Sequence, residues 1–354
     1  MPYTKGFVGG LILLMFLGIW SCDTKDLLEA PSIDYEALPY SYLSQYSFFD
    51  DNNIHKPLGG VVEYEPSAAL FSDYAFKKRY VYLPENAKVS LDKEEVEFPE
   101  GSILIKHFYY PKDFRNPDEE QDWIETRLLI KRKGIWESYS YIWDELQQEA
   151  ELSLVGDIVD VEWIDEQGAS QSLEYTIPNK NQCKSCHHAN GVLKPIGPRL
   201  ETLMQPLEGQ SEKYASQWAY WSDLGMLDSL FSWDGVEAMP DWSNAQVDLH
   251  KRALSYLDMN CGHCHNLEGS AHTSGLFLKY TEKSPSRWGV KKSPVAAGKG
   301  SGGRSYDIVP QYPDSSILVF RMESEDPGIM MPELGRSIRH EEGIALIREW
   351  IKNM

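Results

Sequence analysis

The stretch "MNCGHCHNLE" at 259–268 and its counterpart "NQCKSCHHAN" at 181–190 share one arrangement that governs the fold expected around them. Each holds two cysteines separated by two residues, and a histidine directly follows the second cysteine. Only 9 of the 354 residues are histidine, so a histidine after both pairs is roughly a one-in-1,500 coincidence under independent placement, (9/354)². The two stretches therefore predict two related sites.

Three kinds of chemistry use paired cysteines at this spacing. A zinc ribbon needs four ligands at compact spacing, whereas 74 residues (187–260) separate Cys186 from Cys261. A redox dithiol of the thioredoxin kind needs a βαβ context, which neither stretch has. Covalent c-type haem needs the observed pattern, because two thiols add to its vinyl groups and the next histidine binds the iron. The pattern predicts two covalently bound c-type haems, attached through Cys183, Cys186, Cys261 and Cys264, with His187 and His265 as iron ligands.

The N-terminus has the pattern of an export signal. Lys5 supplies a positive charge, and the apolar run at 7–20 is too short to span a bilayer comfortably. The run ends in "LGIWSC", which resembles a bacterial lipoprotein signal that is cleaved to leave Cys22 for acylation. We expect a signal peptide over 1–21, a tether over 22–35, and an exported protein of the periplasm or cell envelope that is lipid-anchored to a membrane.

The region 36–180 has the pattern of β-strands. The segments "KRYVYLP" (78–84) and "SILIKHFYYP" (102–111) are rich in β-branched and aromatic residues and are bounded by turn residues. The segment 126–143 contains a plausible hairpin turn at "KRKG", and the segment 160–178 contains another at "DEQG". The sequence predicts an all-β, sandwich-like domain over 36–180.

After Pro178 the pattern changes to helices and loops. Apolar residues recur with helical spacing over 211–225, 245–260 and 340–353. A Gly- and Pro-rich stretch at 289–313 is too long to be a simple connector. We expect a multidomain protein, in which the β domain is followed by mainly α cytochrome c-type haem domains. The first haem-binding region would cover 181–243 and the second 244–354.

The segment 244–354 resembles a class I cytochrome c domain in its order of helix, CxxCH, long loop, Met-Pro and terminal helix. In that family a methionine of the returning loop is the sixth iron ligand. The stretch "GIMMPELG" (328–335) lies at the corresponding place. The resemblance implies Met331 as this ligand, with Met330 next and Met322 third.

The sixth ligand of the first haem is less well defined by the sequence. Met239, in "EAMPDW", is the first choice because it has a similar Met-Pro context. Met226, Met204 and the absence of any such ligand stay open as alternatives. The choice matters because an open iron position favours catalysis, whereas two protein ligands favour electron transfer.

The whole mature chain also resembles a family of bacterial diheme c-type cytochromes. The strings that carry this resemblance are "ALFSDYAFKKRYVYLP", "ETRLLI", "NQCKSCH", "RALSYLDMNCGHCHNLEGSAHTSGL", "AAGKGSGG", "YDIVPQYPDSSILVFRM" and "MMPELGR". The resemblance implies haem and electron transfer, and it does not define the sixth ligand of the first haem.

The charge of the chain restricts its partners. The net charge is −20, and no cluster of Lys and Arg offsets the repulsion from phosphates, so nucleic acid is excluded as a partner. A basic redox partner fits better. We expect a membrane-tethered diheme c-type cytochrome that performs one-electron transfer, an electron carrier rather than a catalyst. The alternatives are a diheme peroxidase-like enzyme and the electron-accepting subunit of a periplasmic dehydrogenase.

Overall fold

The computed structural model describes residues 1–2, 31–50, 53–93 and 95–354. The expected lipidation site Cys22, and all but the first two residues of the expected signal peptide, lie outside the described residues. Within the described part of the chain, no helix combines the length and the apolar character needed to cross a membrane.

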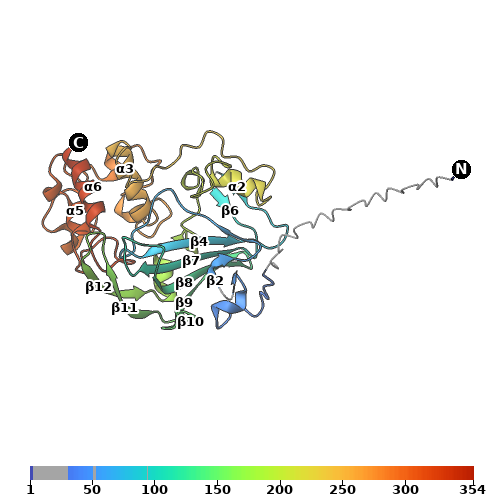
Figure 1. Ribbon diagram of the computed structural model, residues 1–354. Coiled ribbons are helices and arrows are strands. Elements are labelled where there is room, and N and C mark those ends of the chain that lie inside the picture. The colour runs from blue at the N-terminus through green and yellow to red at the C-terminus, as the bar shows by residue number, and fades with distance from the viewer. Residues whose placement is uncertain (3–30, 51–52, 94) are drawn as a thin grey trace.

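The largest sheet has six antiparallel strands in the order β10-β9-β8-β7-β4-β3 (Figure 1). Its strands form where β-branched and aromatic side chains can alternate between two covered faces. The expected hairpin at "KRKG" is confirmed, because Lys133 and Gly134 take positive φ values of 55° and 75° between β8 and β9. The strands are β3 (Val61–Glu63), β4 (Phe76–Tyr82), β7 (Ile103–Pro111), β8 (Gln121–Arg132), β9 (Ile135–Trp143) and β10 (Ala150–Ser153).

The other strands of the described chain form two-stranded pieces. The longest of them pairs β11 with β12 and turns at "DEQG", as the sequence predicts. The region 36–180 is therefore β-structure, but a single six-stranded sheet with short added hairpins replaces the expected sandwich. The paired strands are β1 (Phe49–Asp50) with β2 (Asn53–Pro57), β5 (Ser90–Asp92) with β6 (Glu95–Glu97), β11 (Asp157–Ile164) with β12 (Ser170–Ile177), and β13 (His188–Ala189) with β14 (Val192–Leu193).

Different parts of the chain cover the two faces of the main sheet. The segment 38–48 packs on one face. On the opposite face the segment 200–231 packs at one end, and the β11–β12 hairpin packs at the other. Segments far apart in the sequence therefore pack against one sheet. The buried residues of the core under 200–231 include Val81, Leu104, Leu200, Leu203, Trp218, Trp221 and Phe231.

The region after residue 180 contains less helix than the sequence analysis predicts. The described α-helices are α1 (Lys180–Cys186), α2 (Gln217–Asp223), α3 (Leu249–Leu257), α4 (Pro285–Trp288), α5 (Ile317–Met322) and α6 (Glu341–Lys352). The structure is 25% strand and 21% helix, and only two helices of the described residues are long, so the expected mainly α haem domains are wrong. The segment 211–225 shows the physical reason. Ser216 caps its helix by accepting a hydrogen bond from Ala219 N at 3.2 Å, and the residues before this cap form turns.

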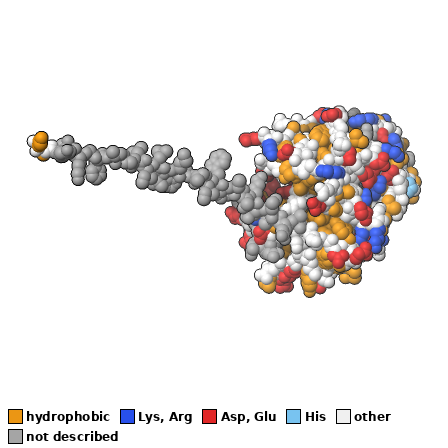
Figure 2. Space-filling view, turned by 90° about the vertical axis from the view of Figure 1, so that its right-hand side faces the viewer, with side chains coloured by type: hydrophobic (Ala, Val, Ile, Leu, Met, Phe, Trp, Pro, Cys, Tyr) orange, Lys and Arg blue, Asp and Glu red, His pale blue; other side chains and the backbone are white. Residues whose placement is uncertain are grey.

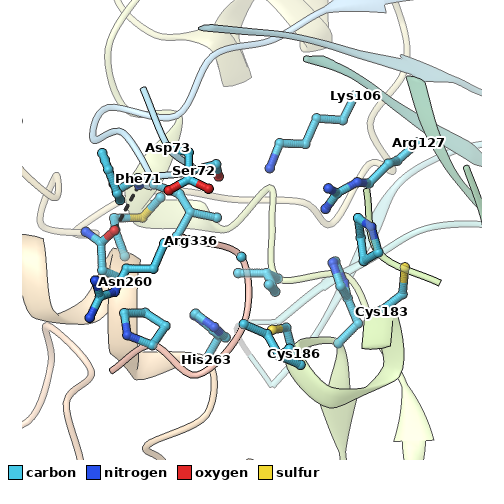
Figure 3. A pocket seen from close by; sticks show the side chains of 18 of the residues that line it. Phe71, Ser72, Asp73, Lys106, Arg127, Cys183, Cys186, Asn260, His263 and Arg336 are labelled. Atoms are coloured by element: carbon cyan, nitrogen blue, oxygen red, sulfur yellow. Dashed lines mark hydrogen bonds between the residues drawn. The ribbon is translucent and has the colours of Figure 1, made fainter. Parts of the chain in front are cut away.

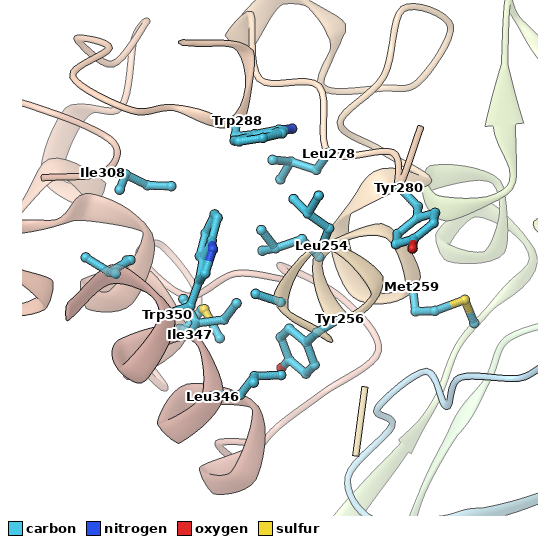
Figure 4. Packing of buried hydrophobic residues seen from close by; sticks show 14 of the residues in the cluster. Leu254, Tyr256, Met259, Leu278, Tyr280, Trp288, Ile308, Leu346, Ile347 and Trp350 are labelled. Carbon is cyan, nitrogen blue, oxygen red and sulfur yellow. The ribbon is translucent and has the colours of Figure 1, made fainter. Parts of the chain in front are cut away.

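Helices α3 and α6 pack together in a second core near the C-terminus (Figure 4). Apolar residues repeat every three to four positions on both helices, as the sequence predicts. Leu254 of α3 and Ile347 of α6 are buried in this core. Trp350 also packs there, and its Nε1 donates a hydrogen bond to His250 Nδ1 at 2.9 Å. This packing fixes the helix that leads into the second cysteine pair.

The close packing of these helices depends on Gly343. A Cβ atom at this buried position would lie 2.2 Å from the Tyr256 hydroxyl oxygen and 2.3 Å from Cζ of the same ring. The ring is held because its hydroxyl forms a 3.1 Å hydrogen bond with His340 Nδ1. We expect Gly343→Ala to lower the free energy of unfolding by about 2 kcal/mol, because overpacking outweighs a helix-propensity gain of about 1 kcal/mol. Urea denaturation measures this change.

The matched control for this substitution is Ala345→Leu, which adds a larger side chain at an exposed position of the same helix. It should change the free energy of unfolding by less than about 0.5 kcal/mol. A Gly343→Ala chain as stable as the parent would contradict the close contact between Gly343 and the Tyr256 ring.

Candidate functional site

The first cysteine pair lies on the short helix α1. The helix begins after Asn179, whose Oδ1 accepts hydrogen bonds from the backbone N–H groups of Asn181 and Gln182, each at 3.0 Å. One helical turn separates Cys183 from Cys186, so the two thiols lie on the same side of the helix. Both cysteines line one cavity. The local sequence therefore presents two thiols to a common space.

The His187 ring is held in one tautomer. The β13–β14 hairpin turns the chain back, so that His187 Nδ1 lies 3.1 Å from the backbone oxygen of Lys194. A carbonyl oxygen only accepts, so Nδ1 carries the proton and Nε2 keeps its lone pair. Burial lowers the pKa of His187 to about 3, which keeps the ring neutral at physiological pH. Metal-binding histidines are commonly oriented by such a bond to the second ring nitrogen.

The second cysteine pair follows α3 without a break. The helix widens into a π-helical turn at Asp258–Gly262, and Cys261 lies in this turn. Turns of this kind are frequent at functional sites. The buried Asp258 carboxylate fixes the turn, because it accepts hydrogen bonds from Tyr280 N at 2.8 Å and from Arg199 Nη1 at 2.9 Å. The turn carries Cys264 out of the helix beside the first motif.

The His265 ring has the same tautomer as His187, through a different partner. Ser274 Oγ donates a hydrogen bond to the backbone oxygen of Ala271 at 2.7 Å. Ser274 Oγ also lies 3.1 Å from His265 Nδ1, and because its own proton is donated to Ala271, it accepts the Nδ1 proton. Nε2 therefore keeps its lone pair. Burial lowers the pKa of His265 to about 4.

The two motifs meet although 73 residues (188–260) separate them in the sequence. Ligand atoms of Cys186, His263 and Cys264 all lie within 4.8 Å of one another. A hydrogen bond shared by the two thiols lowers the pKa of Cys264 and raises the pKa of Cys186. Cys183, Cys186, Cys261 and Cys264 are all free thiols. Two thiols and an imidazole in this arrangement could hold a thiophilic metal ion such as zinc.

A cavity of about 510 Å³ lies between the main sheet, α1, the second motif and the loop 325–337. Its volume is in the range of small-molecule and cofactor sites, about 300–1,000 Å³. In Figure 3, Cys183 and Cys186 lie on one side of this cavity and Asn260 and Arg336 on the other. A second, more open hollow of about 1020 Å³ shares part of the same wall. The residues that line both hollows include Cys186, His187, Arg199 and His263.

Some of the methionines that the sequence suggests as iron ligands line the cavity, and Met239 does not. Met331 lines the cavity, and so do the alternatives Met330 and Met322. Met239 is not among the residues that line it. It is buried in the C-terminal core, where its Sδ lies 3.8 Å from Arg199 Nη2. The cavity therefore contains thioether groups from the Met-Pro loop and none from Met239.

Hydrogen bonds with Arg336 and with Asp73 hold the loop that contains Met331. Arg336 Nε donates a hydrogen bond to the backbone oxygen of Met331 at 3.1 Å. The Asp73 carboxylate accepts hydrogen bonds from the backbone N–H groups of Ser337 at 2.7 Å and Ile338 at 3.0 Å. Asp73 belongs to the segment that leads into β4, so this contact joins the methionine loop to the sheet. The position of Met331 is therefore fixed by residues of both halves of the chain.

Sequence reasoning missed the basic side chains that line the cavity from the sheet. Arg79, Lys106 and Arg127 come from three neighbouring strands and point toward the two motifs. Lys106 and Arg127 are cations within segments that are otherwise largely apolar, "ILIKHFYY" and "ETRLLI", and Arg79 follows two lysines in "FKKRYVY". A lysine or arginine in the middle of a central strand is the signal that would have identified them, because such positions rarely hold a charge without a partner.

The residues fit covalent haem in three respects. Each motif offers two free thiols and one imidazole whose Nε2 is available. The cavity beside them has the size of a cofactor site. Thioether groups line that cavity as well. Both cysteines and the histidine of the first motif line this cavity. Of the second motif, Cys261 lines it, whereas Cys264 and His265 do not.

Comparisons with models of known protein families, with curated proteins and with solved structures find no match to this chain.

Proposed function

We propose that this chain is an exported, membrane-tethered diheme c-type cytochrome that carries out one-electron transfer. The observation that carries the proposal is the shared geometry of its two motifs. In both, the histidine after the cysteine pair donates its Nδ1 proton to an oxygen and keeps Nε2 available. An iron ligand needs this tautomer, and two independent partners impose it. When bound, haem would supply the ferric–ferrous couple.

The contact between the motifs supports transfer within the chain. Sγ of Cys186 and Sγ of Cys264 belong to different motifs and lie within 4.8 Å of each other. Groups attached to these sulfurs would be neighbours. A single electron could then pass between the two sites without a second protein.

A metal site at Cys186, His263 and Cys264 explains less of the structure. It uses three ligands, whereas a structural zinc site almost always has four. It also leaves Cys183 and Cys261 without a role, and it gives no reason for the fixed tautomers of the two motif histidines. The haem proposal accounts for all four cysteines.

The proposal also includes the cellular location of the protein and the charge of its redox partner. Acylation of Cys22 would tether the chain to a membrane in the periplasm or cell envelope. The net charge of −20 would favour a basic redox partner through long-range attraction. On the face seen in Figure 2, acidic and basic side chains are interspersed, so this attraction would come from the net charge rather than from that face.

The electron paramagnetic resonance spectrum of the oxidised, haem-loaded protein tests the proposal, together with its haem content. We expect two haems per chain and two low-spin ferric signals of equal intensity, because electron transfer is favoured when each iron has two protein ligands. A high-spin signal would leave one iron open and favour the peroxidase-like alternative. A chain purified without haem from a host that attaches c-type haem would contradict the proposal.

A further inference from the structure

Three basic residues form a row across the centre of the main sheet. Arg79 of β4 lies directly opposite Lys106 of β7, and Lys106 lies directly opposite Arg127 of β8. All three line the cavity beside the two motifs. Like charges at directly opposed positions of a sheet repel each other and destabilise it. Such a row therefore needs a compensating group.

Among the described residues, only Arg127, at one end of this row, forms an ion pair with an acidic side chain. The Glu125 carboxylate pairs with Arg127, at 2.8 Å from Nε, and also accepts a hydrogen bond from the Tyr175 hydroxyl at 2.8 Å. Neither the Lys106 ammonium nor the Arg79 guanidinium has a hydrogen bond or an ion pair within the described chain. The Lys106 ammonium lies 4.6 Å from the centre of the Phe108 ring. Burial and the neighbouring cations lower the pKa of Lys106 well below its ordinary value.

Arg79 is the strongest indication of a missing partner. Its side chain is buried, with 9% of the residue exposed, and it lines the cavity. A buried guanidinium without a hydrogen bond is costly, because its five donors lose their water. Burial also lowers its pKa. A ligand with acceptor oxygens would satisfy it.

The acidic side chains in the cavity wall do not supply this partner. Asp73 accepts hydrogen bonds from the backbone of residues 337 and 338. Glu325 lies 3.5 Å from Arg339, and Glu333 lies 3.8 Å from Arg321. Each acid is thus engaged on the methionine-loop side of the cavity. The sheet side keeps its positive charge.

The row faces the first motif. Figure 3 shows Lys106 and Arg127 extending from the sheet into the same cavity as Cys183 and Cys186. A ligand attached at Cys183 and Cys186 would therefore have the row beside it.

We propose that Arg79, Lys106 and Arg127 form a binding site for the carboxylate groups of a ligand held in this cavity. Arginine and lysine are the usual partners of carboxylates, and charge-assisted hydrogen bonds are stronger in a site that excludes water. The inference rests on the proposed function, since haem carries two propionate carboxylates and the first motif would attach it here. A free organic dicarboxylate offers the same chemistry.

The test compares Lys106→Met with Lys78→Met in the haem-loaded chain. Lys78 lies on β4 next to Arg79, does not line the cavity, and serves as the matched control. Resonance Raman spectra report the bending modes of the haem propionates. Calorimetric titration with succinate reports binding of a free dicarboxylate to the same purified proteins. Arg79→Gln provides a second variant for both measurements.

If propionates occupy the row, Lys106→Met and Arg79→Gln shift the propionate bands, Lys78→Met does not, and succinate fails to bind the parent. If the chain carries no haem, the proposed function fails. Succinate binding that becomes at least tenfold weaker in Lys106→Met, and is unchanged in Lys78→Met, would then still support a carboxylate site with a free anion as its occupant. Unchanged propionate bands without Lys106-dependent succinate binding would overturn the inference.

Discussion

Replacing Cys183 and Cys186 together by alanine is expected to reduce the covalent haem content from two groups per chain to one. Each motif supplies its own thiols and its own histidine, so loss of one pair leaves the other motif complete. The mass of the intact chain measures the number of attached groups directly. Replacing Cys261 and Cys264 by alanine should give the same count through loss of the other group.

Ser185→Ala is the control for these double substitutions. Ser185 lies between the two cysteines of the first motif and is exposed, so its replacement should leave two haems in place. A chain that keeps its full haem content without Cys183 and Cys186 would show that this motif does not attach haem. The two thiols would then have to be explained by another chemistry, of which the metal site at Cys186, His263 and Cys264 is the nearest at hand.

Glu125→Gln is expected to lower the free energy of unfolding by about 3–5 kcal/mol, the cost of removing one partner from a buried ion pair. The Glu125 side chain is fully buried, and its carboxylate holds both the Arg127 guanidinium and the Tyr175 hydroxyl. The amide keeps the shape but removes the negative charge next to Lys106 and Arg127. Urea denaturation of the haem-loaded chain measures the loss.

Asp122→Asn provides the comparison for Glu125→Gln on the same strand. Asp122 pairs with Lys112 at the surface, where both side chains are about a third or more exposed, at 33% and 45%. Surface ion pairs contribute about 0–1 kcal/mol, so this substitution should have a small effect. If the two substitutions cost the same, Glu125 would not be compensating the basic row.

The strands could be predicted from the sequence because their signals are local. A run rich in β-branched and aromatic residues defines β7, and two residues with positive φ define the turn between β8 and β9. The helix content of the chain after residue 180 could not be predicted from such local signals. Buried tryptophans and leucines hold segment 200–231 on the sheet, but only the residues of α2 within it form an α-helix, and apolar spacing alone does not distinguish helix from loop there.

The candidate site likewise has one part that local sequence predicts and another part that depends on contacts between distant segments. The cysteines and histidines of each motif are adjacent in sequence, so their spacing predicts their chemistry. Two features depend on contacts between distant segments: the meeting of Cys186 with Cys264, and the alignment of Arg79, Lys106 and Arg127. The alignment requires the register of three strands, and a shift of one residue in any strand would move its cation to the other face.

The closeness of Cys186 and Cys264 also sets an order of events during biogenesis. In the finished fold each thiol already has the other beside it, within 4.8 Å. In an oxidising compartment two such thiols tend to form a disulfide. Under the proposed function, the maturation machinery must therefore act on the chain while residues 181–190 and 259–268 are still apart. Folding would then follow the attachment of both haems. A chain that folds before attachment would form a disulfide between the two thiols and would not acquire its haems.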